Sequence, residues 1–272
     1  MLSPQAQKII NDYFNLPFEG LTGIRCPYFN NIRRRARGQL RGLIGKGSPE
    51  EIVEEAKILS MQYQHNIFDK DGFCCLHAAH TDEEKNNDIR KFLIDNDLGI
   101  DCSGLVSQVL VAHFKETQKI DITKKMHFWP LKNFWRYSIA KLRPIENMSV
   151  RVIAKPENTK KITDGREPYD WSLLLPGDLV MMFETGPKNK RNHILLIEDN
   201  YGSIIKYVHS RAWSSEGKYG HGIARGEIKL TAPGHGLIEQ TWEEHGKIND
   251  ENETFWEARD AKIFEVRRIN IK

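Results

Sequence analysis

The stretch that decides the fold is Gly99-Ile100-Asp101-Cys102-Ser103-Gly104-Leu105-Val106, where a loop leads into a helix with a cysteine in its first turn. Asp101 is expected to be the N-cap, because an aspartate side chain there accepts a hydrogen bond from a backbone N–H of the first turn. Ser103 and Gly104 keep the start of the helix small and approachable. Apolar residues then recur at the spacing of one buried helix face, at Leu105, Val106, Val109, Leu110 and Phe114. The spacing predicts a helix over residues 102–114.

Cys102 lies where a reactive thiolate is stabilised. Unpaired N–H groups and the positive end of the helix dipole favour an anion, so we expect the pKa of the Cys102 thiol to lie below its usual value. The thiolate is the nucleophilic form of cysteine. The alternative is that Cys102 serves as a small buried apolar side chain, as a lone cysteine at a helix start often does. A catalytic role therefore requires a base elsewhere in the chain.

Two apolar runs later in the chain, residues 192–198 and 203–209, predict a β-hairpin. A three-residue loop over 200–202 would place Gly202 at the left-handed position that such loops need. The register that follows pairs Asp199 with Ser203, Ile197 with Ile205, Leu195 with Tyr207 and His193 with His209. The two histidines would then be direct cross-strand neighbours on one face. A two-residue loop would instead slip the register by one and send them to opposite faces.

Two imidazoles beside a thiol supply what nucleophilic cysteine chemistry needs, which is a base that takes the thiol proton and a group that orients this base. We expect His193 to be the base and His209 to orient it. The alternative is that both are strand-end histidines without a catalytic role. Their predicted pairing favours the catalytic interpretation.

Four motifs in this order resemble the NlpC family of papain-like cysteine peptidases, which act in bacterial cell-wall turnover. They are Asp101-Cys102-Ser103-Gly104-Leu105-Val106, Leu175-Pro176-Gly177-Asp178-Leu179-Val180, His193 at the start of a strand, and Val208-His209-Ser210. The similarity covers residues 99–212. It implies Cys102 as nucleophile, His193 as general base and His209 as the third, polar member. It also implies a turn over residues 176–178 that leads into a strand over 179–183.

Members of this family usually carry Pro-Tyr and then Trp-Gly-Gly a short way before the cysteine, and the tyrosine hydroxyl lines the active site. Here Cys26-Pro27-Tyr28-Phe29-Asn30-Asn31 contains the Pro-Tyr without the Trp-Gly-Gly, and Tyr28 lies 74 residues before Cys102. The resemblance implies that Tyr28 lines the site, with Asp101 and Ser103 as further substrate-binding positions. Residues 30–98 are then a helical insertion or extension, and residues 99–272 form the peptidase core.

The segment 30–98 is predicted to contain three helices. The first covers 31–44, the second begins with Ser48-Pro49-Glu50-Glu51 and runs to about residue 64, and the third covers about 81–96. The first is strongly basic, with Arg33, Arg34, Arg35, Arg37 and Arg41. Because the whole chain has a formal net charge of only +3 and acids fill the neighbouring helices, a solvated face is favoured over nucleic-acid binding. These arginines could also pair with the carboxylates of a peptide substrate.

Other histidines and cysteines predict no metal site and no cofactor. The run Cys74-Cys75-Leu76-His77-Ala78-Ala79-His80 has adjacent cysteines and a histidine only two residues on, a spacing that fits none of the usual zinc ligand pairs. His221 and His235 each lie between two glycines, which is typical of exposed turns. Either could still reach the cleft as a substrate contact or as a replacement third member.

Length and composition indicate one compact catalytic domain over residues 1–272. The chain is 39% hydrophobic and contains 12 Phe, 8 Tyr and 6 Trp, enough for a substantial core. It has no basic start followed by an apolar stretch, and no window approaches about 18 apolar residues, so neither a signal peptide nor a membrane span is expected. Its 4 cysteines, two of them adjacent, are typical of a reducing compartment. A cytoplasmic enzyme or one with unconventional export is expected, and the oligomeric state stays open.

Helical patterns in the first half and strand patterns in the second predict an α+β fold. Further strands are expected over 149–154, 221–230 and 261–269, with a polar loop over 155–170. The resemblance implies a papain-like arrangement, in which N-terminal helices, including the helix of Cys102, pack on an antiparallel sheet.

The sequence predicts a cysteine peptidase or amidase that forms a thioester on Cys102, with the Cys102 backbone N–H helping to stabilise the oxyanion. By resemblance, the substrate is a peptide or muropeptide, and the bond cut joins γ-D-glutamate to the diamino acid of a peptidoglycan stem peptide. One alternative is an acyltransferase or amidase of the same fold that acts on another substrate. An alternative of a different class is a catalytically silent module that binds anionic polymers through Arg33 to Arg41.

Overall fold

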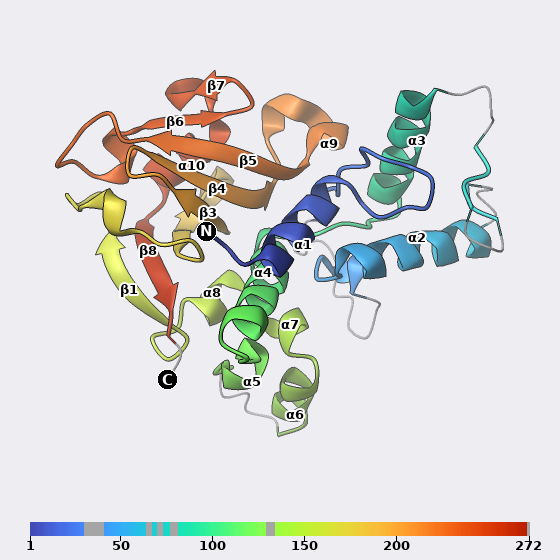
Figure 1. Cartoon of the computed structure of the whole chain (residues 1–272), viewed down its shortest axis with the longest axis horizontal. Coiled ribbons are helices and arrows are strands. Elements are labelled where there is room, and N and C mark those ends of the chain that lie inside the picture. Colours follow the sequence, from blue (N-terminus) through green and yellow to red (C-terminus); the bar gives the residue numbers. More distant parts are fainter. Residues whose placement is uncertain (30–40, 64–66, 70–72, 77–80, 129–133, 271–272) are drawn as a thin grey trace. The chain divides into compact units, whose positions relative to one another are not determined.

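The computed structural model describes residues 1–29, 41–63, 67–69, 73–76, 81–128 and 134–270 (Figure 1). Helices and an antiparallel sheet make up these residues, so the chain has the α+β composition that the sequence predicts. Two compact units are distinguished. The first comprises residues 1–6, 109–209 and 224–272, and the second comprises residues 7–108 and 210–223. The prediction of one catalytic domain with an insertion at 30–98 stays a prediction.

The sheet is antiparallel, with the strand order β1-β8-β2-β3-β4-β5-β6-β7 (Figure 1). The strands are β1 (Thr159–Asp164), β2 (Leu179–Thr185), β3 (Arg191–Asn200), β4 (Ile204–Arg211), β5 (Gly222–Lys229), β6 (Thr241–Glu244), β7 (Lys247–Ile248) and β8 (Ile263–Ile269). The first unit holds most of it, since the division between the units falls near the end of β4 and the start of β5.

One face of the sheet carries the main hydrophobic core of the first unit. Alternate residues of the strands point into it, among them Val180, Leu195, Tyr207 and Trp242, all of which are buried. The helix α10 (Glu253–Asp260) covers this face and contributes Phe255. This core therefore fixes the strands that carry the two histidines.

The first unit also contains α5 (Ile122–Lys125), α6 (Phe134–Leu142), α7 (Pro144–Asn147) and α8 (Val150–Ile153). The second unit contains α2 (Pro49–Gln62), α3 (Asp82–Asp95) and α9 (Gly217–Gly220). The division between the units falls inside α1 (Pro4–Phe14) and α4 (Cys102–Thr117). Among the helices described, none combines the length and the apolar character that crossing a bilayer requires.

The strongest local signals of the sequence are confirmed. The helix of Cys102 extends to Thr117, three residues beyond its predicted end. Both α2 and α3 begin with a capping box, which Ser48 forms with Glu51 and Thr81 forms with Glu84. The strands predicted over 179–183, 221–230 and 261–269 are β2, β5 and β8 within two residues at each end.

Two predictions before β2 are wrong. Residues 149–154 form the short helix α8 instead of a strand, because the Ser149 side chain caps it by accepting from the Val152 N–H. Three apolar residues of this turn, Val150, Val152 and Ile153, are buried, so packing overrides the β propensity of their branched side chains. The predicted loop 155–170 contains β1, whose lysines are exposed because β1 lies at the edge of the sheet beside β8.

The predicted basic helix over 31–44 falls mostly outside the described residues, as do Arg33, Arg34, Arg35 and Arg37. Its described end is a 3-10 turn at Gly42–Ile44 rather than α-helix, and Gly45 ends this turn in the left-handed region with a φ of 71°. Arg41 pairs with Glu51 of α2 at 2.9 Å. This arginine therefore contacts an acid of its own chain.

The raised pKa of Glu257 in α10 predicts that the stability of the fold depends on pH. Burial raises the pKa of its carboxyl from about 4.5 to about 7, although Arg191 lies 3.4 Å away, and the side chain is only 19% exposed. Because the folded state holds this proton more tightly than the unfolded state, stability from this group is fully present below about pH 4.5 and is lost as the pH rises to about 7. The free energy of unfolding of Glu257→Gln minus that of the parent is expected to grow by about 2 kcal/mol from pH 5 to pH 8.

Urea unfolding at pH 5 and at pH 8 measures this difference. Glu251→Gln, which changes an exposed glutamate on the neighbouring turn, is the matched control. An equal gap between parent and Glu257→Gln at the two pH values would contradict the prediction.

Candidate active site

Two strands of the first unit bring His193 and His209 together. His193 lies near the start of β3, opposite Met182 of β2, and His209 lies near the end of β4. The Nε2 atom of His193 is 2.7 Å from the Nδ1 atom of His209, and the rings meet edge to face at 72°. His193 is 7% exposed and His209 is fully buried. The structure therefore holds the two imidazoles in a direct hydrogen bond.

The predicted register of this hairpin is wrong. The structure pairs Leu196 with Val208 and Ile197 with Tyr207, so up to Ile197 each paired β3 residue lies opposite a β4 residue two positions later than predicted. Continuing this register sets His209 opposite Leu195. The histidines are thus diagonal neighbours, whose rings are long enough to meet across the offset.

A two-residue turn and a bulge together explain this result. Tyr201 donates its N–H to the carbonyl of Ile204, which closes a turn over residues 202–203, and Gly202 has the expected left-handed φ of 80°. Such a turn alone would separate the histidines onto opposite faces. An irregularity between Ile197 and Asp199 inserts one extra residue into β3 and restores the shared face.

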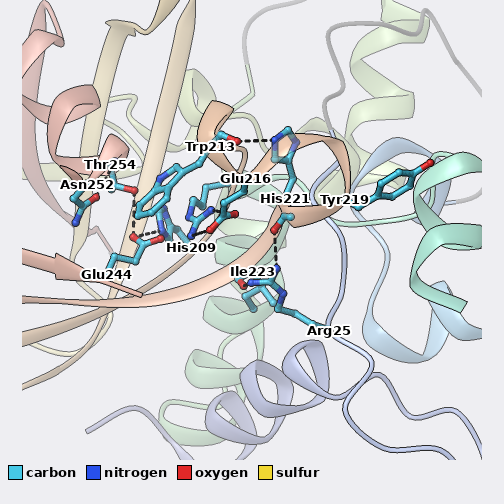
Figure 2. Close-up of polar contacts among 12 residues, drawn as sticks. Arg25, His209, Trp213, Glu216, Tyr219, His221, Ile223, Glu244, Asn252 and Thr254 are labelled. Carbon is cyan, nitrogen blue, oxygen red and sulfur yellow. Dashed lines mark hydrogen bonds and ion pairs between the residues drawn. The ribbon is translucent and has the colours of Figure 1, made fainter. Parts of the chain in front are cut away.

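A buried carboxylate, which the sequence analysis missed, continues the hydrogen-bond chain. Glu244 ends β6, is 1% exposed, and its Oε2 atom lies 2.9 Å from the Nε2 atom of His209 (Figure 2). The same oxygen accepts from the Tyr207 hydroxyl at 3.0 Å and from the Thr254 hydroxyl at 3.2 Å. A signal existed in the alternation of β6, where Trp242 and Glu244 share the buried face.

This order of partners fixes where the protons lie. An ionised carboxylate only accepts hydrogen bonds, so Glu244 requires an N–H on Nε2 of His209. Neutral His209 then accepts at Nδ1, and His193 donates to it from Nε2. In this arrangement, the acceptor nitrogen of His193 is Nδ1.

Cys102 opens α4 in the second unit, and its capping residue lies where the sequence places it. Asp101 accepts at Oδ1 from the Gly104 N–H at 2.6 Å and from the Ser103 hydroxyl at 2.9 Å. A side chain at Gly104 is excluded, because its Cβ would lie 2.2 Å from the carbonyl oxygen of Gly45. Cys102 is 8% exposed. The Asp101 cap and the close approach of the Gly45 carbonyl thus fix the first turn of α4.

Lys46, a second residue missed in the sequence, anchors this turn. Its ammonium is 2% exposed and lies 2.9 Å from Asp101 Oδ1 and 2.6 Å from Ser103 Oγ. Gln108 also donates to the Lys46 carbonyl at 2.8 Å. Asp101 and Ser103 are therefore buried in an ion-pair network that positions the turn of Cys102. Lys46 lies between Gly45 and Gly47, and these neighbours gave no reason to expect its burial.

Tyr28 lies beside the loop that precedes Cys102, in spite of its distance along the chain. It forms a parallel bridge with Ile100, whose N–H donates to the Pro27 carbonyl at 3.0 Å and whose carbonyl accepts from the Phe29 N–H at 3.1 Å. The same carbonyl accepts from the hydroxyl of Ser210 at 2.7 Å. The segment around Tyr28 thus lies beside the loop that precedes Cys102.

The other two histidines that the sequence singles out for the cleft, His221 and His235, each contact a backbone carbonyl. His221 Nε2 lies 2.8 Å from the Trp213 carbonyl, in a loop that Arg25 holds through the carbonyls of Gly220 and Ile223 (Figure 2). His235 is exposed and contacts the Pro233 carbonyl. Cys74 and Cys75 are free thiols, while His77 and His80 lie outside the described residues. Within the described part of the chain, no group of three His, Cys, Asp or Glu side chains is placed to hold a metal ion.

The structure thus groups the predicted site residues into two sets. His193 and His209 form a hydrogen-bonded pair in the first unit, whereas Cys102, Asp101, Ser103 and Tyr28 belong to the second. Comparison with protein-family models, with curated proteins and with solved structures finds no match. The chemistry of the residues themselves is what points to a function.

Proposed function

We propose that this protein is a papain-like cysteine peptidase or amidase of the NlpC type. Cys102 is its nucleophile, His193 its general base and His209 the residue that orients the base. The observation that carries the proposal is the buried chain from His193 through His209 to Glu244, because its polarity leaves Nδ1 of His193 as the base.

Cys102 supports the same assignment from its own unit. Its position at the start of a 16-residue helix favours the thiolate through the helix dipole. Ser210, the residue after His209, donates to the Ile100 carbonyl just before this helix. The proposal assigns the thiol and the imidazoles to one reaction on the chemistry of these residues.

The reaction follows from these roles. Nδ1 of His193 takes the thiol proton, and the sulfur of Cys102 attacks the amide carbonyl to give a tetrahedral oxyanion, which the Cys102 N–H helps to stabilise. The C–N bond then breaks as His193 returns the proton to the departing amine, and a thioester remains on Cys102. Water, deprotonated by His193, attacks this thioester and releases the carboxylic acid and the free thiol.

The substrate we propose is a peptidoglycan stem peptide, cut between γ-D-glutamate and the diamino acid. The resemblance of residues 99–212 to the NlpC family supports this choice. An acyltransferase or amidase that uses the same residues on another amide remains the alternative to be separated by experiment.

The rate of iodoacetamide alkylation at Cys102, followed by peptide mapping as a function of pH, tests the proposal. We expect a reactive shoulder well below the ordinary thiol pKa of about 8.5, and we expect His193→Ala to remove it. Cys75, an exposed free thiol of the same chain, is the internal control, and His193→Ala should leave its alkylation unchanged. If Cys102 titrates like Cys75 and His193→Ala changes nothing, the proposed function is wrong.

Incubation with purified muropeptides then decides the substrate. Mass analysis should show two products whose summed mass exceeds that of the starting muropeptide by one water. The diamino acid should carry the new amine. Unchanged muropeptides together with a reactive Cys102 would favour the alternative amidase or acyltransferase. An unreactive Cys102, with polyanion affinity that falls steeply with salt, would favour a binding module instead.

A further inference from the structure

We propose that Glu244 is a positioning residue that sets the proton order of His209 and His193. This inference rests on the proposed function for its consequence in catalysis, although the proton order itself can be measured without any reaction. It adds a fourth member to the set of Cys102, His193 and His209.

The buried pair of imidazoles has two proton arrangements, and only one of them leaves a base. In the first, His209 carries its proton on Nε2 and accepts at Nδ1 from His193, so Nδ1 of His193 keeps its lone pair. In the second, His209 carries the proton on Nδ1 and donates it to Nε2 of His193, so the proton of neutral His193 lies on Nδ1. Because both rings are buried and 2.7 Å apart, a neighbour must select between these arrangements.

Glu244 makes this selection because its carboxylate offers only acceptors. Its Oε2 atom lies 2.9 Å from Nε2 of His209, so the first arrangement forms a hydrogen bond there. The second arrangement would place two acceptors against each other in a buried site, which is strongly disfavoured. A charged acceptor also stabilises the imidazolium that forms when His193 takes the thiol proton.

Donors from β4 and α10 hold the Glu244 carboxylate in place. Thr254 of α10 donates to Oε2 (Figure 2), as does Tyr207 of β4. Asn252 caps α10 by accepting from the backbone N–H of Thr254 at 2.9 Å. Gly226 of β5 leaves room for the tyrosine, because a Cβ there would lie 2.2 Å from the Tyr207 hydroxyl oxygen. Oε2 of Glu244 thus has His209, Tyr207 and Thr254 as hydrogen-bond partners.

Titratable groups near Glu244 include Tyr207 and His209 on β4, His193 on β3, Lys247 on β7 and Glu257 on α10. The raised pKa of Glu257 includes a contribution from the charge of Glu244. Each of the first two presents a donor to the carboxylate. The arrangement therefore favours an ionised Glu244.

Imidazole nitrogen NMR of the full chain tests the proton order directly. In the parent we expect the Nε2–H tautomer at both His209 and His193. Glu244→Gln keeps an acceptor without the charge and should retain these tautomers, whereas Glu244→Met removes the acceptor and should give a mixture. Glu243→Gln is the matched control, since Glu243 is a neighbour that pairs with Lys229 instead, and it should change nothing.

Alkylation of Cys102 at pH 7 supplies the second readout. We expect a rate lower by about 10-fold in Glu244→Gln and by about 100-fold in Glu244→Met, within the range that general-base assistance contributes. Glu243→Gln, the matched control outside this hydrogen-bond chain, should keep the parent rate.

The outcomes distinguish this inference from the proposed function. A parent with the Nδ1–H tautomer at His209, or tautomers that stay unchanged in a folded Glu244→Met, would overturn the role of Glu244. If Glu244→Met does not fold, an alkylation rate in Glu244→Gln equal to that in Glu243→Gln would overturn it. Tautomers that follow Glu244 beside an ordinary thiol at Cys102 would instead leave this role intact and contradict the proposed peptidase.

Discussion

Replacing His209 with leucine is expected to lower kcat/KM for muropeptide hydrolysis by about 100- to 10,000-fold. Leucine fills most of the buried volume but removes both ring nitrogens. The N–H of His193 and the carboxylate of Glu244 then each lose a partner that now lies within 2.9 Å. His193 becomes free to turn and to change tautomer, so the base is lost along with its orientation.

His209→Gln is the matched variant, because a glutamine amide has the required polarity. Its oxygen can accept from His193 and its NH2 group can donate to Glu244. We expect kcat/KM of His209→Gln to be at least about 10-fold higher than that of His209→Leu. This difference is a part of what general-base assistance contributes. Initial rates give the comparison, and far-UV circular dichroism confirms that both variants are folded. Equal rates in the leucine and glutamine variants would show that the polarity of residue 209 is irrelevant.

The parts of the site that the sequence predicts correctly are those with local signals. Asp101 before an apolar helical repeat specifies the cap and start of α4, and the structure shows the bond to Gly104. The two histidines share a face because strand residues alternate, and a register error of two residues preserves that alternation. The bulge after Ile197 has no signal in the sequence, so the diagonal pairing could not be predicted.

The missed residues depend on contacts between distant segments. Glu244 meets His209 only because β6 pairs with β5 and α10 supplies Thr254. Lys46 meets Asp101 across 55 positions of sequence, and its two glycine neighbours give no reason to expect its burial. A charged residue flanked by apolar or glycine neighbours is normally exposed. Only the partner makes its burial favourable, and the partner is not visible in the local sequence.

Lys46→Ala is expected to lower the free energy of unfolding by about 3–5 kcal/mol, the usual cost of breaking a buried ion pair from one side. The lysine is 2% exposed, and its loss leaves the carboxylate of Asp101 buried beside Ser103 without a cation. The hydroxyl of Ser103 loses a partner at 2.6 Å in the same change. Urea unfolding followed by tryptophan fluorescence measures the effect.

The double variant Lys46→Met with Asp101→Asn is the control that separates charge burial from packing. Methionine keeps most of the lysine volume, and asparagine keeps the cap of α4 while removing the charge. Because no uncompensated charge remains, the double variant should be more stable than Lys46→Met alone. If Lys46→Met costs less than about 1 kcal/mol, or if adding Asp101→Asn lowers stability further, the ion pair does not hold the turn of Cys102. A stable Lys46→Met would then allow alkylation of Cys102 to show whether the ammonium acts on the thiol itself.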